Sequence, residues 1–225
     1  MKLFFLMVIS LNLGVIAQQQ QFRVTTISKK YDVGIKSEKV DYVFWKGKTE
    51  VSLFKKDAAK PFQIIHLKDT QMSVDDNGRP EIASIKDKKD GKWSSVYLED
   101  FNFDGSEDLA VADGDNGGYH GTSYRVYLYN RSRKRFVFST SFTRLVQGPY
   151  IGIFEIDRKK KILSVFWKSG CCAHYSEEYV LVKGNPKKIA KVNELNDPSG
   201  STQIETKKLI RGKWRVWNKT IKNKN

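Results

Sequence analysis

The sequence is poor in cysteine, and this excludes a fold held together by a disulfide framework. Its 225 residues contain two cysteines, Cys171 and Cys172, which are neighbours and cannot link distant segments of the chain. The chain is long enough to bury a sizeable apolar core without such links. We therefore expect the fold to depend on its core and on any metal ion that it binds.

The sequence also lacks an apolar run long enough to cross a bilayer, which takes roughly 20 residues. Its longest apolar stretch covers residues 3–16, follows Lys2, and ends at the small residue Ala17 before four glutamines. This order is typical of a secretory signal peptide. We predict a signal peptide at residues 1–17, cleavage before Gln18, and an exported mature chain, periplasmic or secreted, with no membrane span.

Acidic residues are scarce compared with basic ones. There are 25 Asp and Glu against 40 Lys and Arg, for a formal net charge of +15. Residues 186–225 alone hold eleven Lys or Arg and three Asp or Glu, a local charge of +8. Such a surface attracts polyanions, and we expect an anionic envelope or extracellular glycan rather than nucleic acid. The candidate polyanion-binding residues are Lys207, Lys208, Arg211 and Lys213.

Short runs rich in β-branched and aromatic residues recur through the mature chain, with turn signals between them. In the run at residues 124–130, Tyr124, Val126 and Leu128 alternate with Arg125, Tyr127 and Tyr129, as in a strand with one buried face. Segments 130–134, 157–161, 183–187 and 211–213 read as hairpin turns. Long loops are expected at residues 72–91 and 193–203. We predict one antiparallel all-β domain at residues 18–225, either irregular and propeller-like or a sandwich.

The segment at residues 100–108 has the spacing of a calcium-binding loop. Oxygen-bearing side chains occupy its positions 1, 3, 5 and 9, and Gly105 occupies position 6, where a sharp turn is required. Strands rather than helices are expected on both sides, and position 12 is Val111 instead of the Glu of an EF-hand. Position 7 would contribute its backbone carbonyl. The predicted Ca²⁺ ligands are Asp100, Asn102, Asp104, Ser106 and Asp108.

The charge around this loop supports a cation. Residues 95–119 contain seven Asp or Glu and no Lys or Arg, in a protein of net charge +15. Carboxylates held this close together repel one another unless a cation lies between them. Asp113, Asp115 and Asn116 lie one short strand further on and offer further oxygens, although a plain connecting loop is the alternative there.

The segment at residues 99–111 resembles the calcium-binding motif of FG-GAP and VCBS-type repeats, which occur in integrin-like β-propeller blades. Together with residues 123–130 and 169–184, it is similar to a family of small exported bacterial proteins with one such repeat. Some relatives are periplasmic immunity proteins that inhibit peptidoglycan-cleaving toxins. The resemblance covers roughly residues 62–184 and implies a non-catalytic inhibitor with a peptidoglycan hydrolase as its protein partner.

The remaining features give little support for catalysis. None of the three histidines, His66, His120 and His174, lies in a known nucleophile or metalloenzyme motif. Glu177 and Glu178 are adjacent on a predicted strand and point to opposite faces, which makes them poor partners for acid–base chemistry. An enzyme acting on envelope polymer is therefore the most distant alternative.

Three alternatives remain for the cysteine pair. Cys171 and Cys172 can form a vicinal disulfide in an oxidising compartment. They can instead join His174 in a soft-metal site that lacks an identified fourth ligand. The third alternative is a pair of reduced, partly buried thiols.

Overall fold

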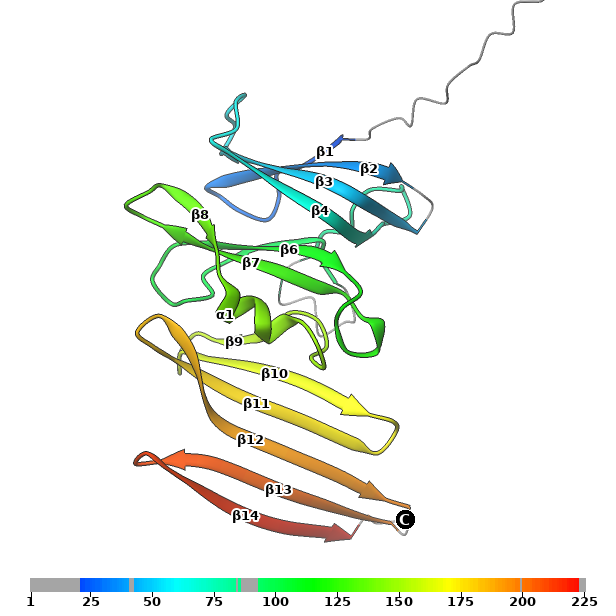
Figure 1. Cartoon of the computed structure of the whole chain (residues 1–225), viewed down its shortest axis with the longest axis vertical. Helices are drawn as coiled ribbons and strands as arrows, with labels where there is room; N and C mark the ends of the chain where they lie inside the picture. The colour runs from blue at the N-terminus through cyan, green and yellow to red at the C-terminus, as the bar shows by residue number, and fades with distance from the viewer. Residues whose placement is uncertain (1–20, 41–42, 84, 86–92, 199, 223–225) are drawn as a thin grey trace, which may run out of the picture.

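The protein is an all-β molecule of three antiparallel sheets, which follow one another along its long axis (Figure 1). This computed structural model describes residues 21–40, 43–83, 85, 93–198 and 200–222. The predicted signal peptide at residues 1–17 lies outside them. The fold class predicted from the sequence is confirmed, in its sandwich-like form. Among the described residues, no helix has the length and apolar character needed to cross a membrane.

The first sheet is a four-stranded meander in the order β1-β2-β3-β4. Its strands are β1 (Gln21–Val24), β2 (Tyr31–Val40), β3 (Phe44–Lys55) and β4 (Gln63–Ser73). Apolar residues alternate along β2 and β3 and face the second sheet, where β4 contacts β6. The Gln63 side chain also bonds both the backbone N–H and the carbonyl of Phe136 in β8, which fixes the two sheets against each other.

The second sheet is a meander in the order β5-β6-β7-β8 and carries the predicted calcium loop. Its strands are β5 (Val96–Glu99), β6 (Asp108–Gly114), β7 (Ser123–Asn130) and β8 (Arg135–Phe138). Tyr124 and Val126 of β7 are fully buried, as their alternation predicts, whereas Leu128 on the same face is half-buried and Tyr127 on the other face is also buried. Residues 109–112 of β6 are buried on both faces because sheets or helices cover both sides of this strand.

The third sheet has six strands in the order β14-β13-β12-β11-β10-β9. Its strands are β9 (Glu155–Asp157), β10 (Ile162–Ser169), β11 (Ala173–Val182), β12 (Asn185–Asp197), β13 (Ser201–Ile210) and β14 (Lys213–Lys222). The short helix α1 (Thr140–Thr143) and the 3-10 turn η3 (Arg144–Val146) follow β8. Helix α1 contacts both β7 and β12 and so joins the second and third sheets.

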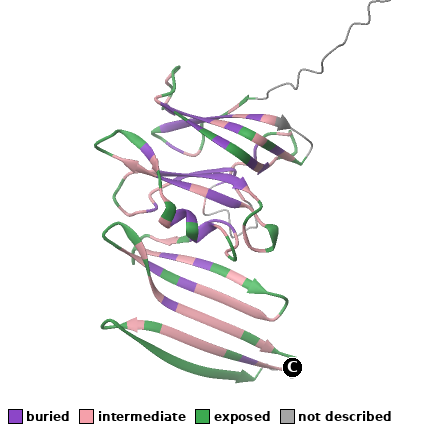
Figure 2. Cartoon of the chain, in the orientation of Figure 1, coloured by how far each residue is buried: buried purple, intermediate pink, exposed green. Residues whose placement is uncertain are grey.

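A single hydrophobic core runs through the three sheets. Its largest fully buried side chains include Trp45, Tyr97, Phe101, Tyr124 and Phe136. The core is densest between the first two sheets and thins along the third, where β14 is exposed along its whole length (Figure 2). The body of the protein is therefore built by the first two sheets and the proximal half of the third.

All four predicted hairpin turns are found between the expected strands: β7–β8, β9–β10, β11–β12 and β13–β14. The predicted long loop at residues 193–203 is wrong. Strand β12 continues to Asp197 and β13 begins at Ser201, and the Thr202 hydroxyl bonds the Asn196 side chain across the pair at 2.8 Å. The side chains of Asn193 and Asn196 bond Glu205 and Thr202 of β13 instead of ending the strand.

Strand β8 ends at Phe138, and α1 follows it because Phe142 turns into the core. One further expectation changes in detail. The loop predicted at residues 72–91 begins only after β4 ends at Ser73. Its residues 84 and 86–92 lie outside the described part of the chain.

Candidate functional site

The predicted calcium loop connects β5 to β6 and has the tight turn that its spacing requires. Gly105, at position 6, adopts φ +83°, a left-handed conformation that side-chain-bearing residues rarely adopt. Phe103, at position 4, is also left-handed, with φ 59°. The loop therefore curls back on itself between Asp100 and Asp108.

The loop's side-chain oxygens converge on its own backbone. Asp100 Oδ1 and Asn102 Oδ1 both accept the Asp104 N–H, each at 3.0 Å, and Asp100 Oδ2 accepts the Gly105 N–H at 2.9 Å. Asp104 Oδ1 accepts the Ser106 N–H at 2.7 Å. Oxygens at positions 1, 3 and 5 thus line the inside of one turn, which is the donor arrangement that a hard cation prefers.

Asp108 differs from the other predicted ligands because it is fully buried at the start of β6. Its Oδ2 accepts the backbone N–H groups of Phe101 and Asn102, and its Oδ1 accepts that of Tyr129 at 2.8 Å. Burial raises the pKa of this carboxyl to about 7 against the opposing effect of the three N–H donors, and the nearby Asp104 charge adds to the rise. Asp108 therefore ties both ends of the loop to β7.

A cationic side chain already lies against the loop. The Arg131 guanidinium, from the β7–β8 turn, donates to Ser106 Oγ at 2.9 Å and to the Asp104 carbonyl, and lies 3.5 Å from Asp104 Oδ1. Among the residues that the structure describes, no group of three or more His, Cys, Asp or Glu side chains is arranged to hold a metal ion. Calcium binding at this loop stays a prediction, supported by the turn and by the converging oxygens.

The segment at residues 114–121 follows β6 and lies at the other end of that strand from the calcium loop. The sequence predicts a plain connecting loop or further oxygen ligands there. Tyr119 and His120 are consecutive, exposed and both left-handed, with φ 57° and 55°. Non-glycine residues rarely adopt this conformation, and they persist in it only where their surroundings hold them. The four glycines of the segment were the available sequence signal.

The segment is held by the loop at residues 147–152. The Gly118 N–H bonds the Tyr150 carbonyl at 2.8 Å, and the Gly148 N–H bonds the Asn116 carbonyl at 2.9 Å. A Cβ on Gly118 would lie 2.3 Å from the Pro149 carbonyl oxygen, so the two loops touch backbone to backbone. We call this pair of segments, residues 114–121 and 147–152, the braced loops.

The third sheet anchors the braced loops. Tyr150 donates its hydroxyl to the buried Glu177 at 3.1 Å, and the same carboxylate accepts from Tyr179 and from Lys188. Glu178 is exposed on the opposite face, as predicted. Glu177 is therefore a fully paired structural carboxylate.

Of the extra oxygen ligands considered, Asp113 is structural. It is buried, accepts from Ser123 at 2.7 Å and pairs with Arg125 at 3.1 Å. Asp115 and Asn116 are exposed, and Asp115 lines a groove of about 290 Å³ together with His120 and Ile151. The structure does not bring them to the calcium loop.

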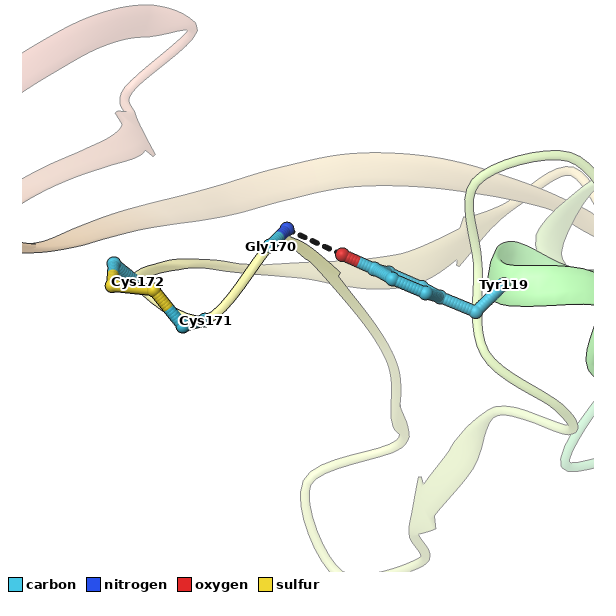
Figure 3. The surroundings of a disulfide bond; sticks show 4 residues. All are labelled: Tyr119, Gly170, Cys171 and Cys172. Atoms are coloured by element: carbon cyan, nitrogen blue, oxygen red, sulfur yellow. Dashed lines mark hydrogen bonds between the residues drawn. A yellow bond between two sulfur atoms is a disulfide. The ribbon is translucent and has the colours of Figure 1, made fainter.

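The cysteines form a vicinal disulfide at the tip of the β10–β11 hairpin, with Cα atoms 3.7 Å apart. The backbone N–H of Gly170, which precedes the pair, donates to the Tyr119 hydroxyl (Figure 3). Lys168 lies over the same ring at 5.1 Å. His174 approaches Glu194 rather than the two sulfurs. The hairpin tip therefore supports Tyr119 from the third sheet.

The candidate polyanion-binding residues do not form one surface. In the register of β13 with its neighbours, Lys207 shares a face with Glu205, to which it is paired at 3.2 Å. Lys208 and Lys213 lie on the opposite face, and Arg211 lies in the turn between β13 and β14. Alternation along the strands separates residues that are close in sequence.

Comparisons with known proteins bear on the fold. No family model matches the sequence, and no curated protein matches it. The chain is similar to a solved structure described as "Structure of a Xanthomonas Type IV Secretion System related protein", with a TM-score of 0.69 and 23% sequence identity. The alignment covers 91% of this chain and 96% of that chain. At this identity the likeness shows a shared fold over nearly the full length of both proteins.

Proposed function

We propose that this is an exported, non-catalytic protein that binds another protein through its braced loops and is stabilised by calcium at residues 100–108. The observation that carries the proposal is the pair Tyr119 and His120. Tyr119 is 58% exposed and projects from a backbone that neighbours hold in an uncommon conformation. An aromatic side chain fixed before binding loses little conformational entropy on association and is a common anchor of protein interfaces.

The surroundings of Tyr119 support binding rather than catalysis. The two well-buried carboxylates nearest to the loops, Asp113 and Glu177, are each paired with a cation and with hydroxyl donors. Neither is left to transfer a proton to a substrate. Calcium would be held by Asp100, Asn102, Asp104, the Ser106 carbonyl and Asp108, and would act on the fold through the second sheet.

The specific form of the proposal is inhibition of a cell-wall hydrolase, an immunity role. It is supported by the resemblance to exported immunity proteins. The description of the structural neighbour, which refers to a bacterial type IV secretion system, fits an exported role. A peptidoglycan hydrolase delivered by a neighbouring bacterium is the partner that this proposal names.

The test is a cell-wall turbidity assay with a panel of purified peptidoglycan hydrolases and the mature protein. We expect stoichiometric inhibition of at least one hydrolase and its loss in Tyr119→Ala. Phe138→Ala is the matched control, because Phe138 is an exposed aromatic residue, 48% accessible, on another part of the second sheet. Equal inhibition by both variants, or none by the wild type, would reject the braced loops as the binding surface.

A further inference from the structure

The third sheet ends in a long, regular edge strand that has neither a bulge nor a proline to block pairing and is protected by its charges alone. Strand β14 has ten residues and pairs on one side only, with β13, in an unbroken register from Ile210↔Lys213 to Ser201↔Lys222. It contains no bulge and no proline, and all ten residues are exposed (Figure 2). One full row of backbone N–H and C=O groups therefore faces outward.

The two faces of β14 differ in charge. Three of its four cations share one face with two apolar residues: Lys213, Arg215, Trp217, Lys219 and Ile221. The other face carries one cation and four uncharged side chains: Trp214, Val216, Asn218, Thr220 and Lys222. Trp214 and Val216 are 47% and 50% exposed. The pairing places Lys208 of β13 directly opposite Arg215, which extends the basic face inward. A strand added to this edge would thus meet most of the cations on one face and mainly uncharged side chains on the other.

This charge pattern excludes a second copy as the favoured occupant. Strand β14 has four cationic residues and no acidic one. Two copies paired edge to edge would bring eight cations together with no counter-charge, and like charges across a strand pair are destabilising. The same pattern favours a strand whose acidic residues face Lys213, Arg215 and Lys219.

We propose that β14 is a docking edge for an extended acidic segment of a partner protein, which adds to the sheet as a seventh strand. The segment would place Asp or Glu on the face of Lys213, Arg215 and Lys219, and β-branched or aromatic residues on the face of Trp214 and Val216. Backbone hydrogen bonds would supply affinity, and the alternation would supply specificity. This edge is separate from the braced loops, so the proposal stands independently of the proposed function.

An anionic polysaccharide is the competing occupant. It would be held by charge alone and would not use the outward backbone groups of β14 or the side chains of Trp214 and Val216. The two occupants therefore differ in their dependence on the order of residues in the ligand and in their effect on β14 amide exchange.

The experiment uses the mature protein and a labelled ten-residue peptide that alternates Glu with Val. Its control peptide has the same composition with the Glu residues grouped, and heparin serves as the anionic polymer. We expect the alternating peptide to bind about tenfold more tightly than the grouped one. Binding should also protect β14 amides from hydrogen exchange.

Two double variants of equal charge change complete the test. Arg215→Glu/Lys219→Glu should abolish binding of the alternating peptide. Lys159→Glu/Lys161→Glu, on the exposed β9–β10 turn, should leave it unchanged. If the two peptides bind with equal affinity, heparin binds too, and the β14 amides are not protected from exchange, the proposal is overturned in favour of a polyanion site. Absence of peptide binding, or a wild-type dimer held through β14, would overturn it as well.

Discussion

Asp32 shows how a buried charge is accommodated in the first sheet. It is 1% exposed and accepts from Arg23 at 2.9 Å and from Lys56 at 3.0 Å. Burial alone would raise its pKa, but the hydrogen bonds from Lys56, Arg23 and the Asp57 N–H outweigh burial and hold the pKa below its usual value of 3.8. The carboxylate therefore ties β1 and the β3–β4 turn to β2.

Replacing this carboxylate should destabilise the fold in a pH-dependent way. Asp32→Asn should lower the free energy of unfolding at neutral pH by about 2 kcal/mol, since both cationic partners are partly solvated. A depressed pKa contributes stability above the unfolded-state value that is lost as pH falls through the folded-state pKa. The gap between wild type and variant should therefore close below about pH 4, measured by urea unfolding across pH.

The control for this measurement is Asp76→Asn, an exposed carboxylate in the loop after β4. It should leave the unfolding free energy nearly unchanged at every pH. A wild-type-to-Asp32→Asn gap that stays constant down to the acid transition would show that the ion pairs contribute nothing through charge.

Gly118 determines how closely the braced loops approach. A methyl group there would meet the Pro149 carbonyl oxygen, so Gly118→Ala should force the loops apart, cost about 1–3 kcal/mol and weaken hydrolase inhibition. Gly78→Ala is the comparison, because its added Cβ would meet nothing within 4 Å although its φ is +70°. It should cost about 1 kcal/mol and leave inhibition intact. Full inhibition by Gly118→Ala would argue against rigid loops as the binding surface.

At the scale of elements, the β10–β11 hairpin links the vicinal disulfide to Tyr119. Reduction of protein exported to an oxidising compartment should raise the intact mass by about two units. The bridge closes a very short loop, so Cys171→Ser/Cys172→Ser should change the free energy of unfolding by less than about 1 kcal/mol. Two thiols titrating in freshly exported protein would contradict the disulfide, and bound zinc would restore the soft-metal interpretation.

The strands and their turns could be predicted from the sequence, whereas the sites formed between strands could not. The alternation of residues along 124–130 predicted that Tyr124 and Val126 are buried, and short charged segments predicted the four hairpin turns. The sequence wrongly predicts a loop at the β12–β13 connection because Asn and Asp, here Asn196 and Asp197, are common in loops. Here the cross-strand bond from Thr202 keeps them in a ladder, and only tertiary pairing reveals that bond.

The candidate site could likewise be predicted only where its geometry depends on neighbouring residues in the sequence. The spacing of residues 100–108 predicted a sharp turn at Gly105 with oxygens inside it, since local geometry follows from local sequence. The bracing of Tyr119 depends on Pro149, Tyr150 and Gly170, which lie 30 to 51 positions away. No periodicity within residues 114–121 carries that information.

At the scale of the whole molecule, charge is unevenly distributed. The acidic segment at residues 95–119 lies in the middle sheet, and the basic β13 and β14 form the far end of the third (Figure 1). If an anionic glycan were the main partner, retention on such a glycan should nearly vanish at about 1 M salt, where the Debye length is about 3 Å. A hydrolase held by the braced loops should stay bound there. Glycan binding at physiological salt without hydrolase binding would favour the glycan as main partner.

Calcium is expected to act on the whole molecule because its loop joins β5 to β6 within the central sheet. At a hundredfold excess over the dissociation constant, a ligand of the folded state adds about 2.7 kcal/mol. For a chain of this size that corresponds to a rise in melting temperature of about 5–10 °C. Asp104→Ala should remove the effect, and Asp76→Ala, an exposed carboxylate elsewhere, should retain it.

The most direct test of the account is the melting temperature of the mature protein in calcium and in chelator. We predict that chelator lowers the melting temperature of the wild type and of Asp76→Ala, and leaves that of Asp104→Ala unchanged. Identical melting curves for the wild type in calcium and in chelator would contradict calcium binding at residues 100–108.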